Sequence, residues 1–236
     1  GNVIHLGERD CSIQRNHQKM IEESPSAAVS PELREKMGHA AVTAAKAAGY
    51  VNAGTIEFLL EPDGKFWFME MNTRIQVEHP VTEWVTGIDL VKEQLKIASG
   101  MPLEISQDDV HIMGHAIECR INAENPQKNF RPSPGTIQGA HFPGGNGIRV
   151  DTCVYNGCKI PPYYDSMLAK LIVHAGNRKE AIAKMQSALG EVIIDGIDTN
   201  IDYQYEILKD EDYQSGNFDT GFLASHIIAG VKINEN

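Results

Sequence analysis

The chain has 236 residues, of which 42% are hydrophobic and 22% are charged, and this composition excludes an intrinsically disordered protein. Its net charge of -11 argues against nucleic acid or an anionic membrane as the main partner, because both attract clustered lysine and arginine side chains. The sequence contains no apolar run of membrane-spanning length and no signal-peptide pattern, so we expect a cytoplasmic protein without a membrane partner.

The first segment that stands out is polar: residues 8–19 have the sequence ERDCSIQRNHQK. We interpret it as a strand and turn that could bind a ligand, because it is dense in hydrogen-bonding side chains. Lys19 could offer a charge to a terminal phosphate or to bicarbonate, and Gln14 and His17 could bond a ribose hydroxyl. A charged surface turn explains the same residues, and for this segment alone it is the simpler interpretation.

Two later stretches carry the signals of helices. Residues 30–49 begin with an N-cap serine, a first-turn proline and an early acid, continue with an alanine-rich pattern, and end at a glycine. Residues 80–99 continue with a second helical pattern, which is interrupted at Gly87 and resumes at Asp89.

Between these helices, residues 54–72 (GTIEFLLEPDGKFWFMEMN) give the clearest hairpin signal in the sequence. A two-residue or four-residue loop closed at Asp63-Gly64 places Glu57 opposite Glu70, with Asn72 two residues along on the same side. The other face of the ribbon is then apolar and suited to packing on a core; it carries Ile56, Phe58, Leu60, Trp67, Met69 and Met71.

Two directly opposed carboxylates, with β-carbons about 5 Å apart, repel each other unless something positive lies between them. Oxygen-only ligands favour Mg²⁺ or Mn²⁺ over zinc, and Mg²⁺ normally completes its shell with water and nucleotide phosphates. The hairpin therefore predicts a metal site formed by Glu57, Glu70 and Asn72. The alternative is an acidic sheet edge that is simply solvated, which is the more common outcome for an arbitrary hairpin.

The segment that follows the hairpin, TRIQVEHPVTE, alternates polar and apolar residues. An extended chain would present Arg74, Gln76 and Glu78 on one side, next to the predicted metal, and Ile75 and Val77 on the other. A planar guanidinium suits a planar bicarbonate or carboxyphosphate, and a carboxylate within reach of the same anion is placed to act as general base. A surface loop with a chance arginine and glutamate explains this segment about equally well when it is taken alone.

The rest of the chain carries further strand and helix signals, and its strand-rich part suggests an antiparallel sheet distinct from the first hairpin. We expect several strands within 114–150, a strand at 167–175, helices at 178–189 and 200–209, a short helix after 216 and a frayed tail at 231–236. The glycine-rich segment 143–147 is interpreted as a turn rather than a phosphate-binding loop, because no helix follows it. The four cysteines lack zinc-type spacing, and we expect them to be reduced thiols.

At several strings the chain closely resembles the biotin carboxylases, the ATP-grasp component of acetyl-CoA, propionyl-CoA and pyruvate carboxylases. These strings are ERDCSIQRNHQK, GTIEFL, EMNTRIQVEHPVTE, ECRINAE, PSPG and YYDSMLAKL. The resemblance runs from about Gly1 to at least Gly221. It implies an α+β fold: the C-terminal part of an ATP-grasp domain, an antiparallel sheet with helices, in residues 1–100, followed by a biotin carboxylase C-terminal domain in residues 101–236.

The resemblance also implies a ligase that uses ATP, Mg²⁺ or Mn²⁺ and bicarbonate to carboxylate biotin on a carrier protein, in partnership with carboxyltransferase subunits; one such enzyme serves fatty acid biosynthesis. The implied metal ligands are Glu57, Glu70 and Asn72, and the implied ATP contacts are Gln14, His17, Glu57, Leu59 and Glu70. The implied bicarbonate contacts are Lys19, Arg74, Gln76, Val77 and Glu78, with Arg120 acting on biotin. Lys19, Arg74, Glu78 and Arg120 are the implied catalytic residues.

In the implied mechanism, Glu78 deprotonates bicarbonate, which attacks the terminal phosphate of ATP to give carboxyphosphate, and Arg120 stabilises the biotin enolate. The match begins in the middle of the ATP-grasp unit, so we expect the isolated chain to have little or no activity. The family's dimer contact, near Asn146 and Arg149, implies a possible homodimer. Two other hypotheses stay open: another ATP-grasp carboxylate ligase, which need not keep Gln76, Glu78 or Arg120, and a non-catalytic dimerisation or scaffold module.

Overall fold

The computed structural model describes residues 1–232, and these fall into two compact units that are each discontinuous in sequence. The first unit consists of Gly1–Arg9 and Ser24–Met113, and the second of Asp10–Glu23 and the chain from Gly114 onward. Residues 10–23, which we expected within a domain at 1–100, thus belong to the second unit, because their strands join its sheet. The expected domain boundary after residue 100 stays a prediction, since the units are defined by compactness alone.

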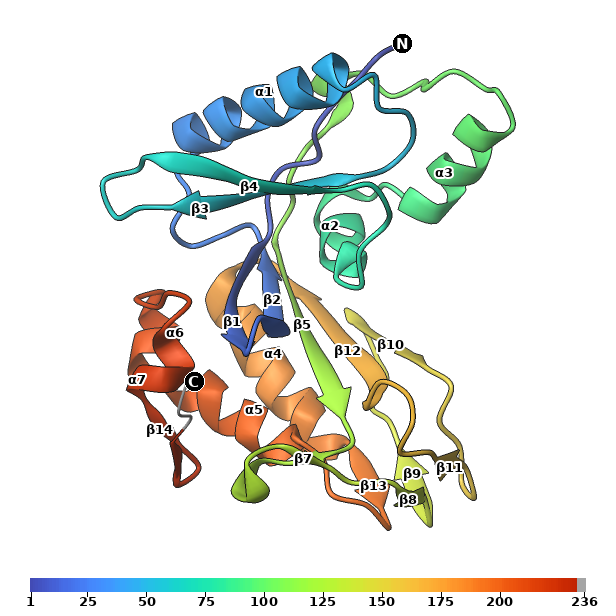
Figure 1. Ribbon diagram of the computed structural model, residues 1–236, viewed down its shortest axis with the longest axis vertical. Helices are drawn as coiled ribbons and strands as arrows, with labels where there is room; N and C mark the ends of the chain where they lie inside the picture. Colours follow the sequence, from blue (N-terminus) through green and yellow to red (C-terminus); the bar gives the residue numbers. More distant parts are fainter. Residues whose placement is uncertain (233–236) are drawn as a thin grey trace. The chain divides into compact units, whose positions relative to one another are not determined.

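The first unit combines helices with a two-stranded hairpin (Figure 1). Its elements are α1 (Pro31–Ala47), β3 (Thr55–Leu60), β4 (Phe66–Asn72), α2 (His79–Thr86), α3 (Leu90–Ala98) and the 3-10 turn η1 (Gln107–Asp109). The predicted N-cap is confirmed, because the Ser30 hydroxyl accepts the Leu33 N–H at 3.2 Å. The predicted break at Gly87 is also confirmed, since this residue ends α2 with a φ of 71°, a conformation that favours glycine.

The hairpin has the predicted register where the acids lie and a different one near its turn. Glu57 faces Glu70 and Thr55 faces Asn72, but Phe58 faces Phe68. Near the turn, the loop is one residue longer than a two-residue closure, since Glu61 N–H donates to the Lys65 carbonyl at 2.8 Å. A bulge in β4 absorbs the extra residue and restores the predicted pairing at the acids.

The bulge overturns the predicted position of Trp67. This residue pairs with Leu59, so it lies on the same face as Glu57 rather than on the apolar face. Its side chain is 57% exposed and its indole nitrogen donates to Glu61 Oε1 at 2.9 Å. The expectation that Trp67 packs in a core is therefore wrong, whereas Phe58 and Phe66 do pack edge to face with centroids 5.2 Å apart.

The second unit is built on a five-stranded sheet with the strand order β1-β2-β5-β12-β10. These strands are β1 (Asp10–Arg15), β2 (Gln18–Ser24), β5 (His115–Asn122), β12 (Met167–Ala175) and β10 (Ile148–Thr152). Its helices are α4 (Arg178–Glu191), α5 (Ile201–Lys209), α6 (Glu211–Ser215) and α7 (Phe222–Ser225). The remaining short elements are β6 (Glu124–Asn125), η2 (Pro126–Lys128), β7 (Arg131–Pro132), β8 (Gly135–Thr136), β9 (Gly139–His141), β11 (Lys159–Ile160), β13 (Ile193–Asp195), β14 (Ile227–Ile228) and β15 (Val231–Lys232).

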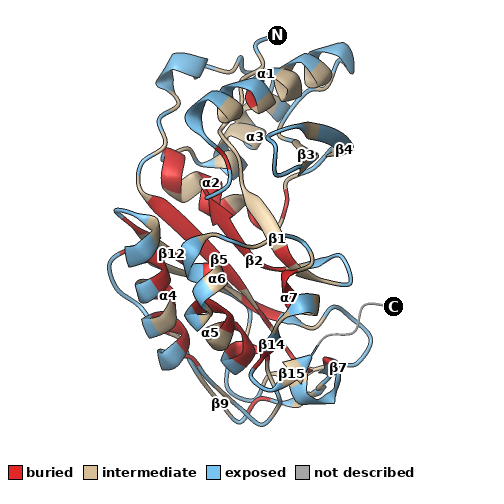
Figure 2. Ribbon diagram, turned by 90° about the vertical axis from the view of Figure 1, so that its left-hand side faces the viewer, coloured by how far each residue is buried: buried red, intermediate tan, exposed pale blue. Residues whose placement is uncertain are grey.

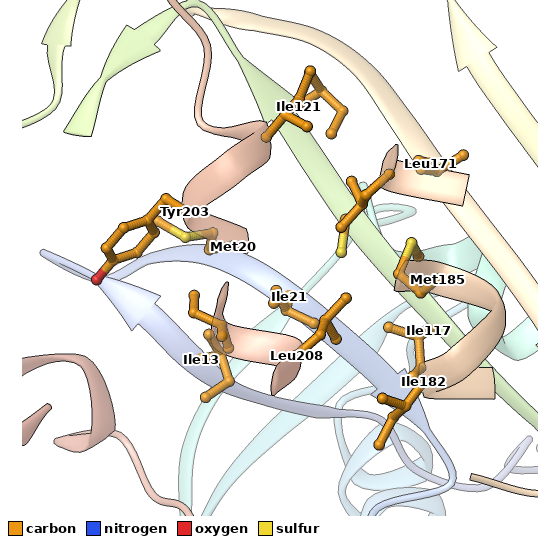
Figure 3. Close-up of a cluster of buried hydrophobic side chains, with 14 of the residues drawn as sticks. Ile13, Met20, Ile21, Ile117, Ile121, Leu171, Ile182, Met185, Tyr203 and Leu208 are labelled. Carbon is orange, nitrogen blue, oxygen red and sulfur yellow. The ribbon is translucent and has the colours of Figure 1, made fainter. Parts of the chain in front are cut away.

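Helices α4 and α5 pack against this sheet, and the main hydrophobic core lies between them and the strands. Figure 2 shows the buried residues concentrated on β2, β5, β12 and the inner sides of these helices. Figure 3 shows how side chains from the strands and helices meet in one cluster. Alternate residues of β5 and β12 supply the strand contribution, because successive side chains of a strand point to opposite faces. The labelled members are Ile13, Met20, Ile21, Ile117, Ile121, Leu171, Ile182, Met185, Tyr203 and Leu208.

The structure bears on several further predictions from the sequence. The α+β fold is confirmed, and residues 143–147 form the expected turn between β9 and β10. All four cysteines are free, and burial raises the pKa of the Cys119 thiol well above its ordinary value. The expected frayed tail begins instead with β15, which pairs with β14, and residues 233–236 lie outside the described residues. Within residues 1–232, none of the helices combines the length and the apolar character that crossing a bilayer requires.

Candidate functional site

The first group of candidate residues lies on one face of the β3-β4 hairpin, where two acids oppose each other. Asn72 Nδ2 donates to Glu57 Oε1 at 3.1 Å and to Glu70 Oε1 at 2.8 Å. Gln76 Nε2 adds a bond to Glu57 Oε1 at 2.7 Å. The predicted convergence of Glu57, Glu70 and Asn72 is therefore confirmed as geometry: amide N–H groups stand between the two carboxylates and offset their repulsion.

These side chains fit a hard divalent cation. An amide N–H group that bridges two carboxylates occupies a position where positive charge is favoured, and a metal ion supplies more of it. Asn72 can present its oxygen in place of its nitrogen after a half turn of the amide, which would complete an oxygen-only donor set. Such a set suits Mg²⁺ or Mn²⁺ rather than zinc.

The segment after the hairpin is not the extended chain that the sequence suggested. Arg74 lies in a bend, and Val77 and Glu78 form the turn that leads into α2. The Arg74 guanidinium and the Gln76 side-chain amide still lie next to the hairpin acids. Arg74 Nη2 donates to Asn72 Oδ1 at 3.4 Å, and Gln76 Nε2 donates to Glu57 Oε1. The change of direction has a physical cause, because Pro80 suits the first turn of a helix and favours its start at His79.

Glu78 is the most enclosed member of this group. Its residue is 2% exposed although it stands at the N-cap position of α2, and its side chain makes no cap hydrogen bond there. Helix starts normally gain from a capping oxygen, so the burial of this carboxylate is not explained by capping.

Arg9 is a residue that the sequence analysis missed. Its guanidinium donates to Thr82 Oγ1 at 3.1 Å, to Thr55 Oγ1 at 3.0 Å and to Gln76 Oε1 at 2.5 Å. It thereby ties β3, the segment before α2 and α2 itself together, and it fixes the amide that bonds Glu57. The string ERD carries no local signal for this role, because its partners lie 46 to 73 residues away.

The second group of candidate residues lies in the second unit, on the β1-β2 hairpin and on β5. Asn16 and His17 form the turn with φ values of 48° and 61°, the positive values that a tight two-residue hairpin requires. Gln14 faces Lys19 across the strands, and His17 is exposed at the tip. The interpretation of this segment as strand and turn is thus confirmed.

Lys19 and Arg120 line the same shallow pocket. Its other lining residues come from β1, β2, β5, β6 and the N-cap of α5; they are Arg15, Gln18, Met20, Asn122, Glu124 and Asn200. Arg120 Nε donates to Glu22 Oε1 at 2.5 Å, and its Nη2 bonds the same oxygen. Lys19 and Arg120, which were predicted as site residues from separate segments of the sequence, therefore lie at the same pocket.

Of the predicted residues, the first unit holds Glu57, Leu59, Glu70, Asn72, Arg74, Gln76, Val77 and Glu78, and the second holds Gln14, His17, Lys19 and Arg120. Leu59 lies two residues from Glu57 on the same face of β3, beside Trp67, and both apolar side chains are exposed. This face of the hairpin therefore offers an apolar surface next to the acid pair.

Comparison with known proteins begins with two family models that together match most of the chain. Residues 1–106 match the model described as "Carbamoyl-phosphate synthase L chain, ATP binding domain". Residues 118–225 match the model described as "Biotin carboxylase C-terminal domain". The two matches follow one another along the chain without overlapping.

Individual relatives show more specifically which proteins the chain resembles. The chain is 59% identical to biotin carboxylase 1 of Bacillus subtilis over 98% of its own length and 51% of the relative, and 57% identical to the biotin carboxylase of a Nostoc species over 94% and 50%. The biotin carboxylase domain of the 2-oxoglutarate carboxylase from Hydrogenobacter thermophilus, solved as a dimer with MgADP, ADP and bicarbonate, superimposes with a TM-score of 0.93 at 53% identity, over 94% of this chain and 49% of that one. The chain belongs to the biotin carboxylase family, and it spans about half the length of the curated relatives it matches.

Proposed function

We propose that the protein that carries this chain uses ATP, Mg²⁺ and bicarbonate to carboxylate biotin on a carrier protein. The observation that carries the proposal is the hairpin in which Asn72 bridges Glu57 and Glu70. An opposed acid pair of this kind is costly to keep unless it holds a cation, and a nucleotide phosphate is the usual further ligand of Mg²⁺.

In the first unit, we assign Glu57, Glu70 and Asn72 to the metal. When bound there, Mg²⁺ would neutralise charge on the phosphates of ATP. The exposed Leu59, together with Trp67 beside it, offers the base an apolar surface.

Bicarbonate is the substrate that we assign to the segment 74–78. The guanidinium of Arg74 supplies forked donors for two oxygens of the anion, and the Gln76 amide and the Val77 backbone add hydrogen-bonding groups. Glu78 is assigned as the base that removes the bicarbonate proton. Its 2% exposure supports this role, because a carboxylate shielded from bulk water exchanges its proton with a bound anion rather than with solvent.

In the second unit, we assign Lys19 to bicarbonate, Gln14 and His17 to the ribose, and Arg120 to biotin. Lys19 and Arg120 both line the shallow pocket, which concentrates positive charge for anionic groups. Arg120 would stabilise the negative charge that develops on the ureido oxygen of biotin when its ring nitrogen loses a proton.

The proposed reaction has three steps. Deprotonated bicarbonate attacks the terminal phosphorus of ATP, forming carboxyphosphate and releasing ADP. Carboxyphosphate then breaks its bond between carboxyl carbon and bridging oxygen to give carbon dioxide and phosphate. The departing phosphate takes the proton from the biotin ring nitrogen, and that nitrogen bonds to carbon dioxide. Catalysis of the first step consists of positioning and charge neutralisation, which is what cationic and amide side chains provide.

The remaining expectations concern partners and location. We propose a biotin-bearing carrier protein and carboxyltransferase subunits as partners, and self-association as a homodimer through the region of Asn146 and Arg149. The dimeric structure from Hydrogenobacter thermophilus supports self-association. We propose a cytoplasmic location, although relatives from Populus and Arabidopsis are chloroplastic proteins.

A test of the proposal measures bicarbonate-dependent ATP hydrolysis and carboxybiotin formation in the complete natural protein that carries this sequence. Glu78→Gln should lower both rates roughly 100-fold or more, since it removes the base while keeping the shape of the side chain. The matched control is Glu83→Gln on the same helix, whose oxygen accepts the Leu90 N–H at 2.9 Å, a bond that glutamine can keep; it should leave both rates near those of the unchanged protein. An unchanged protein that turns over ATP with another carboxylate but not with bicarbonate would contradict the proposal.

A further inference from the structure

A row of charged side chains crosses the second unit's sheet from β2 to β10. Register places Lys170 of β12 directly opposite Arg120 of β5, and Asp151 of β10 directly opposite Lys170. Glu22 of β2, the strand on the other side of β5, bonds the Arg120 guanidinium. The row therefore has two cations on β5 and β12 and one acid on each of the strands that flank them, β2 and β10.

The two cations repel each other, because directly opposed residues of an antiparallel pair have β-carbons only about 5 Å apart. Asp151 offsets this on one side, with its Oδ2 lying 3.4 Å from Lys170 Nζ. Glu22 offsets it on the other side through Oε1, which accepts both from Nε and from Nη2 of Arg120. Without Glu22, repulsion by Lys170 would favour a different direction for the arginine side chain.

Because Glu22 and Arg120 are largely shielded from water, their ion pair depends on favourable geometry. Glu22 is 0% exposed, and the Arg120 side chain is 17% exposed. A carboxylate in such a position is stabilised only by well-formed hydrogen bonds and an opposite charge. Glu22 binds the guanidinium along its Nε–Nη2 edge. Because the guanidinium is planar, these bonds also fix the direction in which its opposite edge points.

The backbone of Arg120 is held as well. Its carbonyl oxygen accepts from Asn200 Nδ2 at 3.0 Å and from Gln204 Nε2 at 2.5 Å. Both ends of this residue are thus fixed by neighbours, one end by a buried acid and the other by two amides of the segment that starts α5.

We propose that Glu22 is a positioning residue that holds the Arg120 guanidinium in the direction needed to act on biotin. This inference rests on the proposed function, in which Arg120 stabilises the biotin enolate. Glu22 does not touch the reacting atoms; it acts through Arg120. A carboxylate is required for this, since a neutral side chain of the same shape can accept a hydrogen bond but does not offset the Lys170 charge.

The neighbouring residue in β2 gives a matched control. Glu23 is also buried and also binds an arginine: Arg178 Nε and Nη2 donate to its two oxygens at 2.7 and 3.0 Å, and His115 Nε2 lies 2.6 Å away. Its partner Arg178 starts α4 and has no assigned part in the reaction. Successive residues of a strand face opposite sides, so the two acids make equivalent bonds in different surroundings.

The experiment compares Glu22→Gln with Glu23→Gln in the complete natural protein, with folding checked by thermal unfolding. The readout is the ratio of the biotin carboxylation rate to the rate of bicarbonate-dependent ATP hydrolysis measured without biotin. We expect Glu22→Gln to lower this ratio roughly 10- to 100-fold, as misplacement of a stabilising group does, and Glu23→Gln to leave it unchanged. Glu22→Asp, which keeps the charge but shortens the side chain, should restore part of the ratio.

Three results would overturn the inference. The first is a Glu22→Gln protein with an unchanged ratio, and the second is an equal fall of the ratio in both glutamine variants, which would mark Glu22 as merely structural. If Glu22→Gln fails to fold, the ¹⁵Nε–H signal of Arg120 in the unchanged protein decides, assigned by its loss in Arg120→Lys. A slowly exchanging signal supports the grip by Glu22, and exchange as fast as that of a solvent-exposed arginine is the third contradicting result. Absence of biotin-dependent turnover in the unchanged protein would instead overturn the proposed function.

Discussion

Two pairs of glutamates, one in each compact unit, have their negative charge offset in different ways. On the β3-β4 hairpin, Glu57 and Glu70 face each other and share the amide of Asn72. In the five-stranded sheet, the neighbouring residues Glu22 and Glu23 lie on one strand and each binds an arginine. The sheet acids are thus paired with arginines within the fold, whereas the hairpin acids receive neutral amide donors that a cation can replace.

This difference teaches how to distinguish a structural acid from a ligand-binding one. Burial and a guanidinium partner indicate a carboxylate that holds another side chain of the protein rather than a ligand, because an unpaired buried charge is strongly destabilising. Two acids that face each other on a more open surface, and that are bridged only by a neutral amide, indicate a site that a bound cation would stabilise. Removing an acid from the sheet should therefore cost stability, and removing one from the hairpin should cost binding.

The largest expected effect is on stability, from Glu23→Ala. Arg178 and His115 would lose their buried partner, and the free energy of unfolding should fall by about 3–5 kcal/mol. Chemical denaturation of the chain measures this. Asp63→Ala, at the exposed tip of the hairpin where the acid pairs with Lys65, should leave the midpoint unchanged. Equal denaturation midpoints for the two variants would contradict the claim that the buried ion pair of Glu23 stabilises the fold.

The same pair predicts a dependence on pH. Burial alone would raise the pKa of Glu23, but the bonds from His115 and Arg178 dominate and lower it below the ordinary 4.5. The stabilisation by this carboxylate is therefore fully present above its unfolded-state pKa and is lost as pH falls through the lower, folded-state pKa. Glu23→Ala should flatten the loss of stability on the acid side.

A smaller effect is expected for Arg9→Met in the first unit. This change removes three hydrogen bonds, to Thr82, Thr55 and Gln76, and the free energy of unfolding should fall by about 2 kcal/mol. The variant should also bind divalent cations more weakly, because Gln76 then holds Glu57 less firmly. Arg131→Met, at an exposed position of the second unit, serves as the control. Loss of stability without any loss of cation binding would show that Gln76 does not support the metal site.

The smallest effect concerns His226, which bonds Asp212 at 3.1 Å. Burial alone would lower the pKa of this imidazole, but its hydrogen bonds to Asp212 and to the backbone carbonyl of Phe222 raise that pKa above 6.5. Its stabilisation is present below the unfolded-state pKa and is lost as pH rises through the folded-state pKa. His226→Gln should therefore lower the melting temperature slightly at about pH 5.5 and not at about pH 8.5. His39→Gln, on the exposed side of α1, should change neither value.

The sequence predicted those parts of the fold whose signals are local. The cap at Ser30 and the break at Gly87 depend on residues within one helical turn, and both are observed. The pairing of Glu57 with Glu70 was predicted correctly although the loop length was not, because the bulge in β4 compensates for the longer loop. The same bulge moved Trp67 to the other face, and nothing in the local pattern announces a bulge.

Contacts between distant segments could not be predicted in the same way. Arg9 reaches Thr82, and Arg120 meets Glu22, across 73 and 98 residues. Such pairs depend on which strands become neighbours in the sheet, and hydrophobic periodicity alone does not specify that order. The resemblance to biotin carboxylases supplied the roles of individual residues, whereas the partners that hold those residues came from the structure.

The central claim, that Glu57, Glu70 and Asn72 hold a divalent cation, is tested most directly by titrating the chain with Mn²⁺ and following the free ion by electron paramagnetic resonance. The account predicts that the unchanged chain and Glu61→Gln, a glutamate on the same hairpin, bind one ion with equal affinity, while Glu70→Gln binds it roughly 10- to 100-fold more weakly. Equal affinity in Glu70→Gln and the unchanged chain, or no binding by the unchanged chain, would contradict it.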